Sequence, residues 1–355
     1  MNKKNHYYQP PFYLKNGLIQ TVYIAKVMEK KWQKYLNLNP IPYQEKIYHG
    51  MNNTPLYAIG AIPPHAKGTI IATYGITGSL ENQWYLEVLA RKAYYLGYAI
   101  ILFDWRAHGK TAQLSPVLTS DGIFEGQDFL SIASHAKQEG FPSKFWFTGY
   151  SLGGKLALWA ISYGSKITKI NNQSTLTAND IGGCGVICPS LDADKSLSYL
   201  ENHPIKKYLD KVITKGLREL TISLHKYHPQ DISLKNLALV DSIRKFDQYF
   251  VISALGFENV RDYYYASSPF RILSTINKPT LIIYAKDDPM FCPTIIPDLQ
   301  KEVAYNSHLN LMLTAHGGHV GYVNSKQGQK INGDNDIWWA WNRFLNWVIK
   351  EDVDN

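Results

Sequence analysis

The stretch GYSLGG, from Gly149 to Gly154, lies between two apolar runs, KFWFTGY before it and LGGKLALW after it. The first run has the length and composition of a buried β-strand, and the second has those of a helix. A serine between glycines at a strand-to-helix turn is typical of a nucleophile on a sharp turn, because glycines leave room for the chain to pass close by. The pattern predicts that Ser151 is a nucleophile, the alternative being a small residue in a tight turn.

A helix that begins after Ser151 would direct backbone N–H groups and the positive end of its dipole at the serine, which suits an oxyanion. We therefore expect the Leu152 N–H to be one oxyanion donor. The second donor should come from the loop after an early strand, residues 72–84, with the sequence ATYGITGSLENQW. There Gly75 permits the turn, and the Ile76 N–H would pair with the Leu152 N–H. A phosphate-binding loop is a weaker interpretation, because no Lys-Ser/Thr pair follows the glycines.

A serine nucleophile needs a base, and the base needs an acid that orients it. On folds with this type of turn the chain order is serine, acid, histidine. The run LIIYAKDDPMF places Asp287 and Asp288 directly after a predicted strand. We predict Asp288 as the acid, because it stands three residues past Ala285 and just before a proline, and we leave a turn or cap role to its neighbour.

The base should follow the last strand, where LTAHGGHVGYVN supplies His316 and His319. The Gly-Gly pair between them gives the loop freedom to bring an imidazole over the edge of the sheet. His319, beyond the glycines, is the predicted base in preference to His316. The predicted catalytic set is thus Ser151, His319 and Asp288.

Short β-rich runs alternate with helical patterns along most of the chain, which predicts an α/β fold with a mostly parallel, doubly wound sheet. Between residues 190 and 275 the pattern is charged and helical without a clear strand, so we interpret this segment as a helical lid inserted into one domain of residues 1–355. An insertion between late strands would lie at the carboxyl edge, where ligands bind. Expected strands are EKIYHG, PLYAIG, 68–74, 98–104, 145–150, 185–188, 279–285 and 309–314, and expected helices are 18–37, 82–96, 124–138, 152–163, 294–303 and 336–350.

The composition is that of a globular protein, with 45% hydrophobic and 19% charged residues in 355. The formal net charge of +8 comes from scattered Lys and Arg residues, which favours a solvated basic surface over a nucleic-acid partner. The three cysteines, Cys184, Cys188 and Cys292, show no paired spacing and predict a reducing compartment without disulfides. The first two lie in an apolar run, so we expect buried side chains rather than metal ligands, and no metal or cofactor is predicted.

No secretory signal and no apolar stretch long enough to span a membrane is seen, so we expect a soluble, cytoplasmic protein. The last helix carries Trp338, Trp341, Leu345 and Val348 at helical spacing. This face could pack on a sheet or touch a membrane peripherally, and packing on a sheet is the preferred interpretation.

With these pieces in place, the sequence resembles the α/β-hydrolase family, and within it the YheT-type branch that also contains eukaryotic acylglycerol and phospholipid hydrolases. The resemblance covers nearly the whole chain. It is carried by QPPFYLKNGLIQT, YGITGS, GYSLGG, the long stretch from SIRKFDQYF to YAKDDPMF, and HGGHVGY, the last two being the most specific. It implies an α/β-hydrolase fold and a charge-relay set of Ser151, Asp288 and His319.

Two departures from the family pattern are visible. Tyr74 stands where the early loop usually begins with His, and DWRAHGKT replaces the FRG run that is more common in this branch. Because they affect the loop and the pocket, the departures bear on the substrate more than on the mechanism. We expect Tyr74, Gly75 and Tyr150 to contact the substrate.

The sequence therefore predicts a serine carboxylic-ester hydrolase that works through an acyl-enzyme on a small acyl ester or lipid ester. A thioesterase, amidase or acyltransferase would use the same residues. A non-catalytic binding protein that keeps the fold is the other alternative.

Overall fold

The computed structural model describes residues 7–167 and 176–354. The strands in these residues form one eight-stranded sheet with the order β1-β2-β4-β3-β5-β6-β7-β8. β1 and β2 are antiparallel, as are β2 and β4, and all later neighbours are parallel. The strands are β1 (Gln44–His49), β2 (Pro55–Ala61), β3 (Thr69–Thr73), β4 (Ala99–Phe103), β5 (Phe145–Tyr150), β6 (Ile181–Ile187), β7 (Thr280–Ala285) and β8 (Leu309–Thr314).

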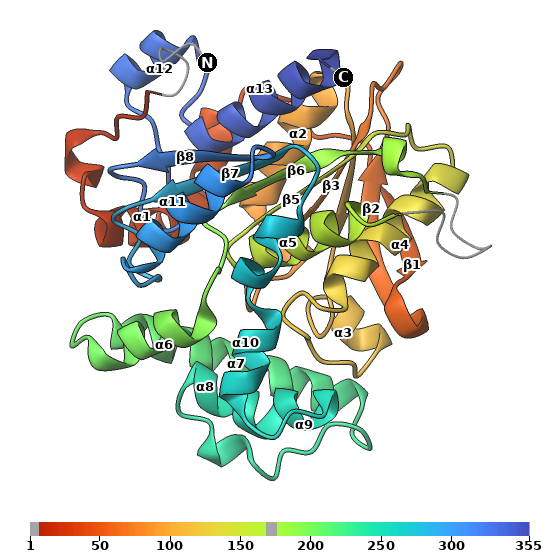
Figure 1. Cartoon of the computed structure of the whole chain (residues 1–355), viewed down its shortest axis with the longest axis vertical. Helices are drawn as coiled ribbons and strands as arrows, with labels where there is room; N and C mark the ends of the chain where they lie inside the picture. The colour runs from red at the N-terminus through yellow and green to blue at the C-terminus, as the bar shows by residue number, and fades with distance from the viewer. Residues whose placement is uncertain (1–6, 168–175, 355) are drawn as a thin grey trace.

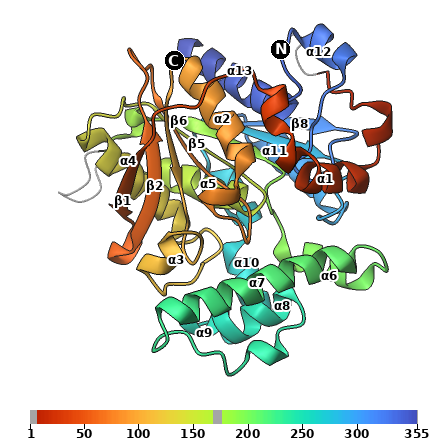
Figure 2. The same ribbon diagram turned by 180° about the vertical axis from the view of Figure 1, so that it is seen from behind.

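Helices cover both faces of this sheet. α4 and α5 pack together on one face, and α2 and α13 lie on the other (Figures 1 and 2). The Trp341 indole N–H of α13 donates to the Tyr85 carbonyl of α2 at 3.0 Å. The helices outside the insertion are α1 (Gly17–Lys26), α2 (Trp84–Tyr95), α3 (Thr111–Leu114), α4 (Glu125–Gln138), α5 (Leu152–Gly164), α11 (Ile295–Tyr305), α12 (Lys326–Asn332) and α13 (Trp339–Asp354). The predicted fold class, an α/β-hydrolase fold with a mostly parallel sheet, is confirmed.

Every residue of β3, β4, β5, β6 and β7 is buried, as expected of parallel strands covered on two faces. β6 is longer than the predicted strand 185–188, because pairing with β5 outweighs the low strand propensity of Gly182 and Gly183. The rings of Trp146 and Trp347 fill the space that side chains at these two glycines would need.

The predicted helix 18–37 is wrong beyond residue 26. α1 ends at Lys26, and two short 3₁₀ turns, Met28–Lys30 and Trp32–Tyr35, follow it. The tighter turns let the Trp32 ring stack on Trp84 at a centroid distance of 6.4 Å. Tertiary packing of one tryptophan thus overrides a helical sequence pattern.

The segment between β6 and β7, residues 188–279, is fully described and contains no strand. It forms a separate helical layer at the end of the sheet where the parallel strands finish (Figure 1). We refer to residues 190–275 as the helical insertion. Its elements are α6 (Ala193–Asn202), α7 (Lys207–Tyr227), α8 (Ile243–Phe246), a π-helical turn (Asp247–Val251), α9 (Ile252–Leu255) and α10 (Val260–Ser267).

The aromatic face at the C-terminal end of the chain belongs to the core. Trp338, Trp341, Leu345 and Val348 are each at most 1% exposed. Packing on the sheet is therefore correct, and these four side chains cannot form a membrane-touching face. None of the helices in the described ranges has the length and hydropathy that crossing a membrane requires.

Candidate active site

Ser151 occupies the sharp turn between β5 and α5. Its backbone has φ 56° and ψ −126°, a region that side-chain-bearing residues seldom adopt. The conformation is held because the Ser151 N–H donates to the Ile187 carbonyl at 3.0 Å. A Cβ atom at Gly153 would collide with the carbonyl of Tyr74, so only glycine lets β3 pass the first turn of α5.

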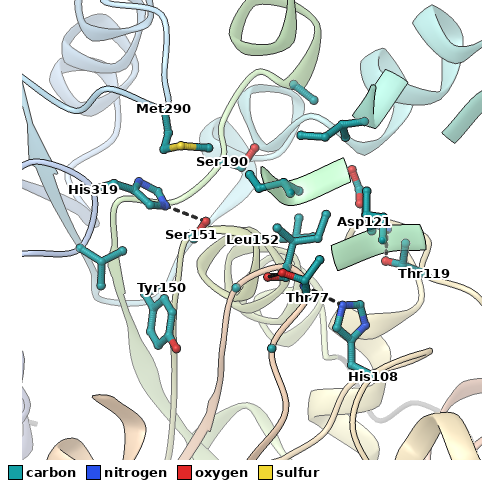
Figure 3. Close-up of a pocket in the computed structure, with 18 of the residues that line it drawn as sticks. Thr77, His108, Thr119, Asp121, Tyr150, Ser151, Leu152, Ser190, Met290 and His319 are labelled. Carbon is teal, nitrogen blue, oxygen red and sulfur yellow. Dashed lines mark hydrogen bonds between the residues drawn. The ribbon is translucent and has the colours of Figure 1, made fainter. Parts of the chain in front are cut away.

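The Ser151 side chain begins a chain of two hydrogen bonds. Its Oγ lies 2.9 Å from His319 Nε2 (Figure 3). His319 Nδ1 in turn lies 2.8 Å from Asp288 Oδ2. Asp288 is buried and also accepts the Met290 N–H at 2.8 Å, which fixes the carboxylate opposite the imidazole. The fold thus brings together the three side chains predicted as nucleophile, base and acid, from three separate loops at one edge of the sheet.

Asp287 and His316, the neighbours that sequence left as alternatives, lie elsewhere. Asp287 Oδ1 accepts the Gly318 N–H at 3.0 Å, and its Oδ2 lies 3.5 Å from His316 Nδ1. These contacts brace the loop that carries His319. Neither Asp287 nor His316 is among the residues that line the cavity at Ser151.

The two predicted oxyanion donors face the same space as the serine. Ile76 and Leu152 both line the cavity, and among the described residues no acceptor is recorded for either backbone N–H. A Cβ at Gly75 would stand 3.0 Å from Ser151 Cβ, so glycine lets this loop approach the nucleophile closely. Both N–H groups are free to bind an oxygen atom of a ligand.

Tyr74 is not the substrate contact that the sequence predicted. Its side chain is fully buried, does not line the cavity, and donates its hydroxyl to Asp104 Oδ1. Burial raises the pKa of the Tyr74 hydroxyl, which therefore keeps the proton that it donates. Asp104 also accepts the N–H groups of Leu80 and Lys110, each at 2.8 Å. Tyr74 thus ties the start of the Gly75–Ile76 loop to the loop after β4.

His108 is a residue of this loop system that sequence reasoning missed. Its Nε2 accepts the Thr77 N–H at 3.0 Å, its Nδ1 lies 2.9 Å from the Arg106 carbonyl, and its ring stacks on Trp105 (Figure 3). Burial lowers the pKa of His108 to about 4, so the ring is neutral near pH 7 and its unprotonated Nε2 can accept the hydrogen bond from the Thr77 N–H. The sequence signal that could have pointed to His108 is the DWRAHGKT run, which contains it and departs from the family pattern.

Tyr74→Phe should destabilise the protein, because it leaves the buried Asp104 carboxyl without one donor. We expect the free energy of unfolding to fall by about 1–3 kcal/mol in urea titrations. Tyr265→Phe is the matched control, since Tyr265 is 67% exposed, and it should change the free energy of unfolding by less than about 0.5 kcal/mol. A Tyr74→Phe protein as stable as wild type would contradict the role given to this hydroxyl.

A cavity of about 480 Å³ opens at Ser151 and extends under the helical insertion. Gly75 and Tyr150, predicted to contact substrate, both line it. Figure 3 shows the Tyr150 ring below Ser151, and the Tyr150 hydroxyl donates to Gln83 Oε1. Much of the remaining wall is apolar and comes from the insertion and from the loop after β7, namely Leu197, Leu200, Ile213, Leu217, Leu220, Ile243, Phe246, Met290 and Phe291. The space suits an apolar chain beside the nucleophile.

One group of side chains in the described ranges has metal-ligand types within reach of one another, Cys188, Asp288 and His319. Burial raises the pKa of the Cys188 thiol, so it is protonated, and a neutral thiol is a poor metal ligand. His319 Nδ1 and Asp288 Oδ2 already bond to each other. These residues fit a hydrogen-bonded catalytic set better than a metal centre.

Comparison with known proteins places the chain in a family. No family model matches it. The sequence is 45% identical over 351 residues to a Synechocystis protein named "Putative esterase slr0264", covering 98% of this chain and 95% of the relative. The chain belongs to the YheT-type branch of the α/β-hydrolase family.

Other members of the α/β-hydrolase family agree with this placement. Mouse "Phospholipase ABHD3" is 26% identical over 276 residues, which cover 77% of this chain and 62% of that protein. The Escherichia coli protein "Putative esterase YheT" is 40% identical over 92 residues, 26% of each chain. Among solved structures, the Pyrococcus furiosus esterase Pf2001 superimposes with a TM-score of 0.52 at 15% identity, covering 88% of this chain and 96% of that one. That structure supports the α/β-hydrolase fold.

Proposed function

We propose that this α/β-hydrolase is a serine carboxylic-ester hydrolase. The observation that carries the proposal is the continuous arrangement of Ser151 Oγ, His319 Nε2 and Nδ1, and Asp288 Oδ2 at 2.9 and 2.8 Å. Ile76 and Leu152, whose backbone N–H groups have no acceptor among the described residues, line the cavity at this serine. Nucleophile, base and orienting acid in this geometry perform acyl transfer on several unrelated folds.

In the first half of the reaction, Ser151 Oγ attacks the carbonyl carbon of the ester while His319 Nε2 takes its proton. The charge that develops on the carbonyl oxygen is bound by the N–H groups of Ile76 and Leu152. Asp288 holds the imidazolium in place. His319 then gives the proton to the departing alcohol oxygen, the C–O bond breaks, and an acyl-enzyme remains.

In the second half, a water molecule repeats these steps. It loses a proton to His319 Nε2, adds to the acyl carbon, and the Ser151 Oγ leaves with that proton. The carboxylic acid is released, and serine is restored. The side chains described here supply every proton transfer in the cycle.

An acyl or lipid ester is the proposed substrate class. The cavity at Ser151 has a largely apolar wall and room for a short to medium acyl chain. Relatives named "Phospholipase ABHD3" and "Monoacylglycerol lipase" lie in the same family. An ester of an apolar acid fits these observations together.

Labelling with a fluorophosphonate tests the proposal, because such reagents react with a serine that a neighbouring base activates. We expect one labelled site, on the peptide that contains Ser151, and hydrolysis of p-nitrophenyl esters with a preference for chains that fill the cavity. Parallel assays with thioesters and anilides of the same acids separate an esterase from a thioesterase or an amidase. A protein that neither labels nor hydrolyses any of these compounds would refute the proposed function.

A further inference from the structure

The cavity contains an acidic end that the proposed reaction does not use. We call it the acidic subsite and define it by Asp121, Asp247 and Tyr264, all of which line the cavity. Asp121 lies across the cavity from His319 (Figure 3), while Asp247 and Tyr264 come from the helical insertion. Asp247 begins a π-helical turn, a rare conformation that is frequent at functional sites.

Asp247 is a buried carboxyl group that lacks a cation of its own. It is 7% exposed, and its Oδ2 accepts the Tyr264 hydroxyl at 2.5 Å. The nearby cations pair with other carboxylates, one of them Asp121 of the same subsite. Lys155 Nζ bonds to Asp121 Oδ2 at 2.8 Å, and Arg244 pairs with Asp194 and Glu201.

The carboxyl groups that line the cavity outnumber the basic groups near them, since Lys155 pairs with Asp121 from behind the lining. The lining, as far as the structure describes it, includes Glu29, Asp121 and Asp247 and no Lys or Arg, although the chain has a net charge of +8. Burial, together with Asp121 nearby, raises the pKa of Asp247 to about 8, so this carboxyl holds a proton at neutral pH. A positive charge placed beside Asp247 would favour the loss of this proton and would compensate the carboxylate that forms, whereas a negative charge would be repelled once the proton is lost.

Two further features of the cavity wall point to a ligand. The Ser196 hydroxyl from α6 lines the cavity, is 4% exposed, and has no partner within the described ranges. The aromatic rings of Phe246 and Tyr264 also line the cavity, and aromatic faces attract cations, as the Arg244 guanidinium 5.5 Å from the Tyr264 ring centroid illustrates. A buried hydroxyl without a partner, an aromatic wall and a buried carboxyl in one cavity are features of a binding site for a polar, positively charged group.

We propose that the acidic subsite binds an ammonium group carried by the substrate, in its acyl or its alcohol part. The subsite then selects cationic esters over neutral esters and excludes anionic ones. This inference rests on the proposed function, because only an esterase would have the bound ester as its substrate. The binding of an ammonium group does not itself depend on catalysis. It can therefore be tested by binding alone.

The test uses three six-carbon probes, hexyltrimethylammonium, 1-hexanol and hexyl sulfate, in isothermal titration calorimetry with the full chain at pH 8.5. We expect hexyltrimethylammonium to bind at least about tenfold more tightly than 1-hexanol, and hexyl sulfate to bind least. Asp247→Asn, which resembles the protonated carboxyl in shape, should reduce the affinity for the cation at least about tenfold. Glu29→Gln removes the same charge from an exposed position on the rim and should change that affinity by less than about twofold.

The pH dependence gives a second measurement that needs no variant. The charge of hexyltrimethylammonium does not change with pH, while Asp247, which faces Asp121, Lys155, Arg244 and Tyr264, loses its proton as the pH rises through about 8. Affinity for the cation should therefore rise from pH 6.5 to 8.5 in wild type and Glu29→Gln, and 1-hexanol should show no such rise. This measurement decides the matter if Asp247→Asn does not fold.

Three results would overturn the inference. The first is equal affinity for the three probes. The second is an Asp247→Asn protein that keeps the preference for the cation, which would show that Asp247 only positions Tyr264. The third is a loss of affinity for the cation in Glu29→Gln as large as that in Asp247→Asn. This result would show that the cation responds to the overall negative charge of the cavity and not to Asp247. If the cation binds as expected but fluorophosphonate does not label Ser151, the proposed function fails and the acidic subsite stands.

Discussion

Ser151→Ala should lower kcat for a p-nitrophenyl ester by about 10⁴-fold or more, since the nucleophile of a Ser-His-Asp set contributes at least this much. The hydroxyl that would attack the ester carbonyl is lost, while the backbone N–H groups of Ile76 and Leu152 stay in place. Substrate binding should change little, because alanine removes one oxygen atom from the cavity. Initial rates and the binding of a non-hydrolysed ester analogue measure the two effects separately.

The same variant should lose fluorophosphonate labelling and keep the folded state. Ser162→Ala is the matched control, because Ser162 lies on the same helix, α5, with its hydroxyl 3.2 Å from Thr275 Oγ1 and away from the cavity. It should keep kcat and labelling near the wild-type values. Full esterase activity in Ser151→Ala would show that the nucleophile has been assigned to the wrong residue.

Asp288→Asn is expected to reduce kcat by about 10⁴-fold. The carboxylate that faces His319 Nδ1 at 2.8 Å would become an amide, which cannot stabilise an imidazolium and can hold the ring in the wrong tautomer. The substitution keeps the size of the side chain, so the loss should appear in kcat rather than in folding. Steady-state kinetics and thermal unfolding of the same preparation measure both.

Asp287→Asn provides the control with the same chemical change one residue earlier. Asp287 supports the loop through the Gly318 N–H at 3.0 Å, and an amide oxygen can still accept that bond. We expect kcat to fall by less than about tenfold. If instead Asp287→Asn lost activity and Asp288→Asn kept it, the acid of the catalytic set would be Asp287, and the order of these two residues in the site would have to be reversed.

Several parts of the site were predictable from sequence because local rules decide them. The glycines around Ser151 allow only a few backbone conformations at a strand-to-helix turn, and the order serine, acid, histidine follows from the order of the strands. The repeated apolar runs predicted the parallel sheet because strands covered on two faces must be apolar throughout. The same reasoning located the helical insertion as a break in that rhythm.

Side-chain direction in the loops was not predictable in the same way. Tyr74 turns into the core because Asp104, from the loop after the next strand, accepts its hydroxyl. His108 was missed because the Thr77 N–H that it accepts belongs to a loop far from it in sequence. The helix predicted to continue past Lys26 ends there because Trp32 packs on Trp84.

The sequence by itself determined the strand-to-helix turn at Ser151, the parallel sheet, and the order in which Ser151, Asp288 and His319 follow the strands, because each depends on neighbours in the chain. Tertiary structure alone decided what faces the cavity. It set Tyr74 apart from the cavity, and it brought Asp247 of the insertion near Asp121 of the core. Burial and electrostatic interaction depend on distance in space, and no local pattern specifies that distance.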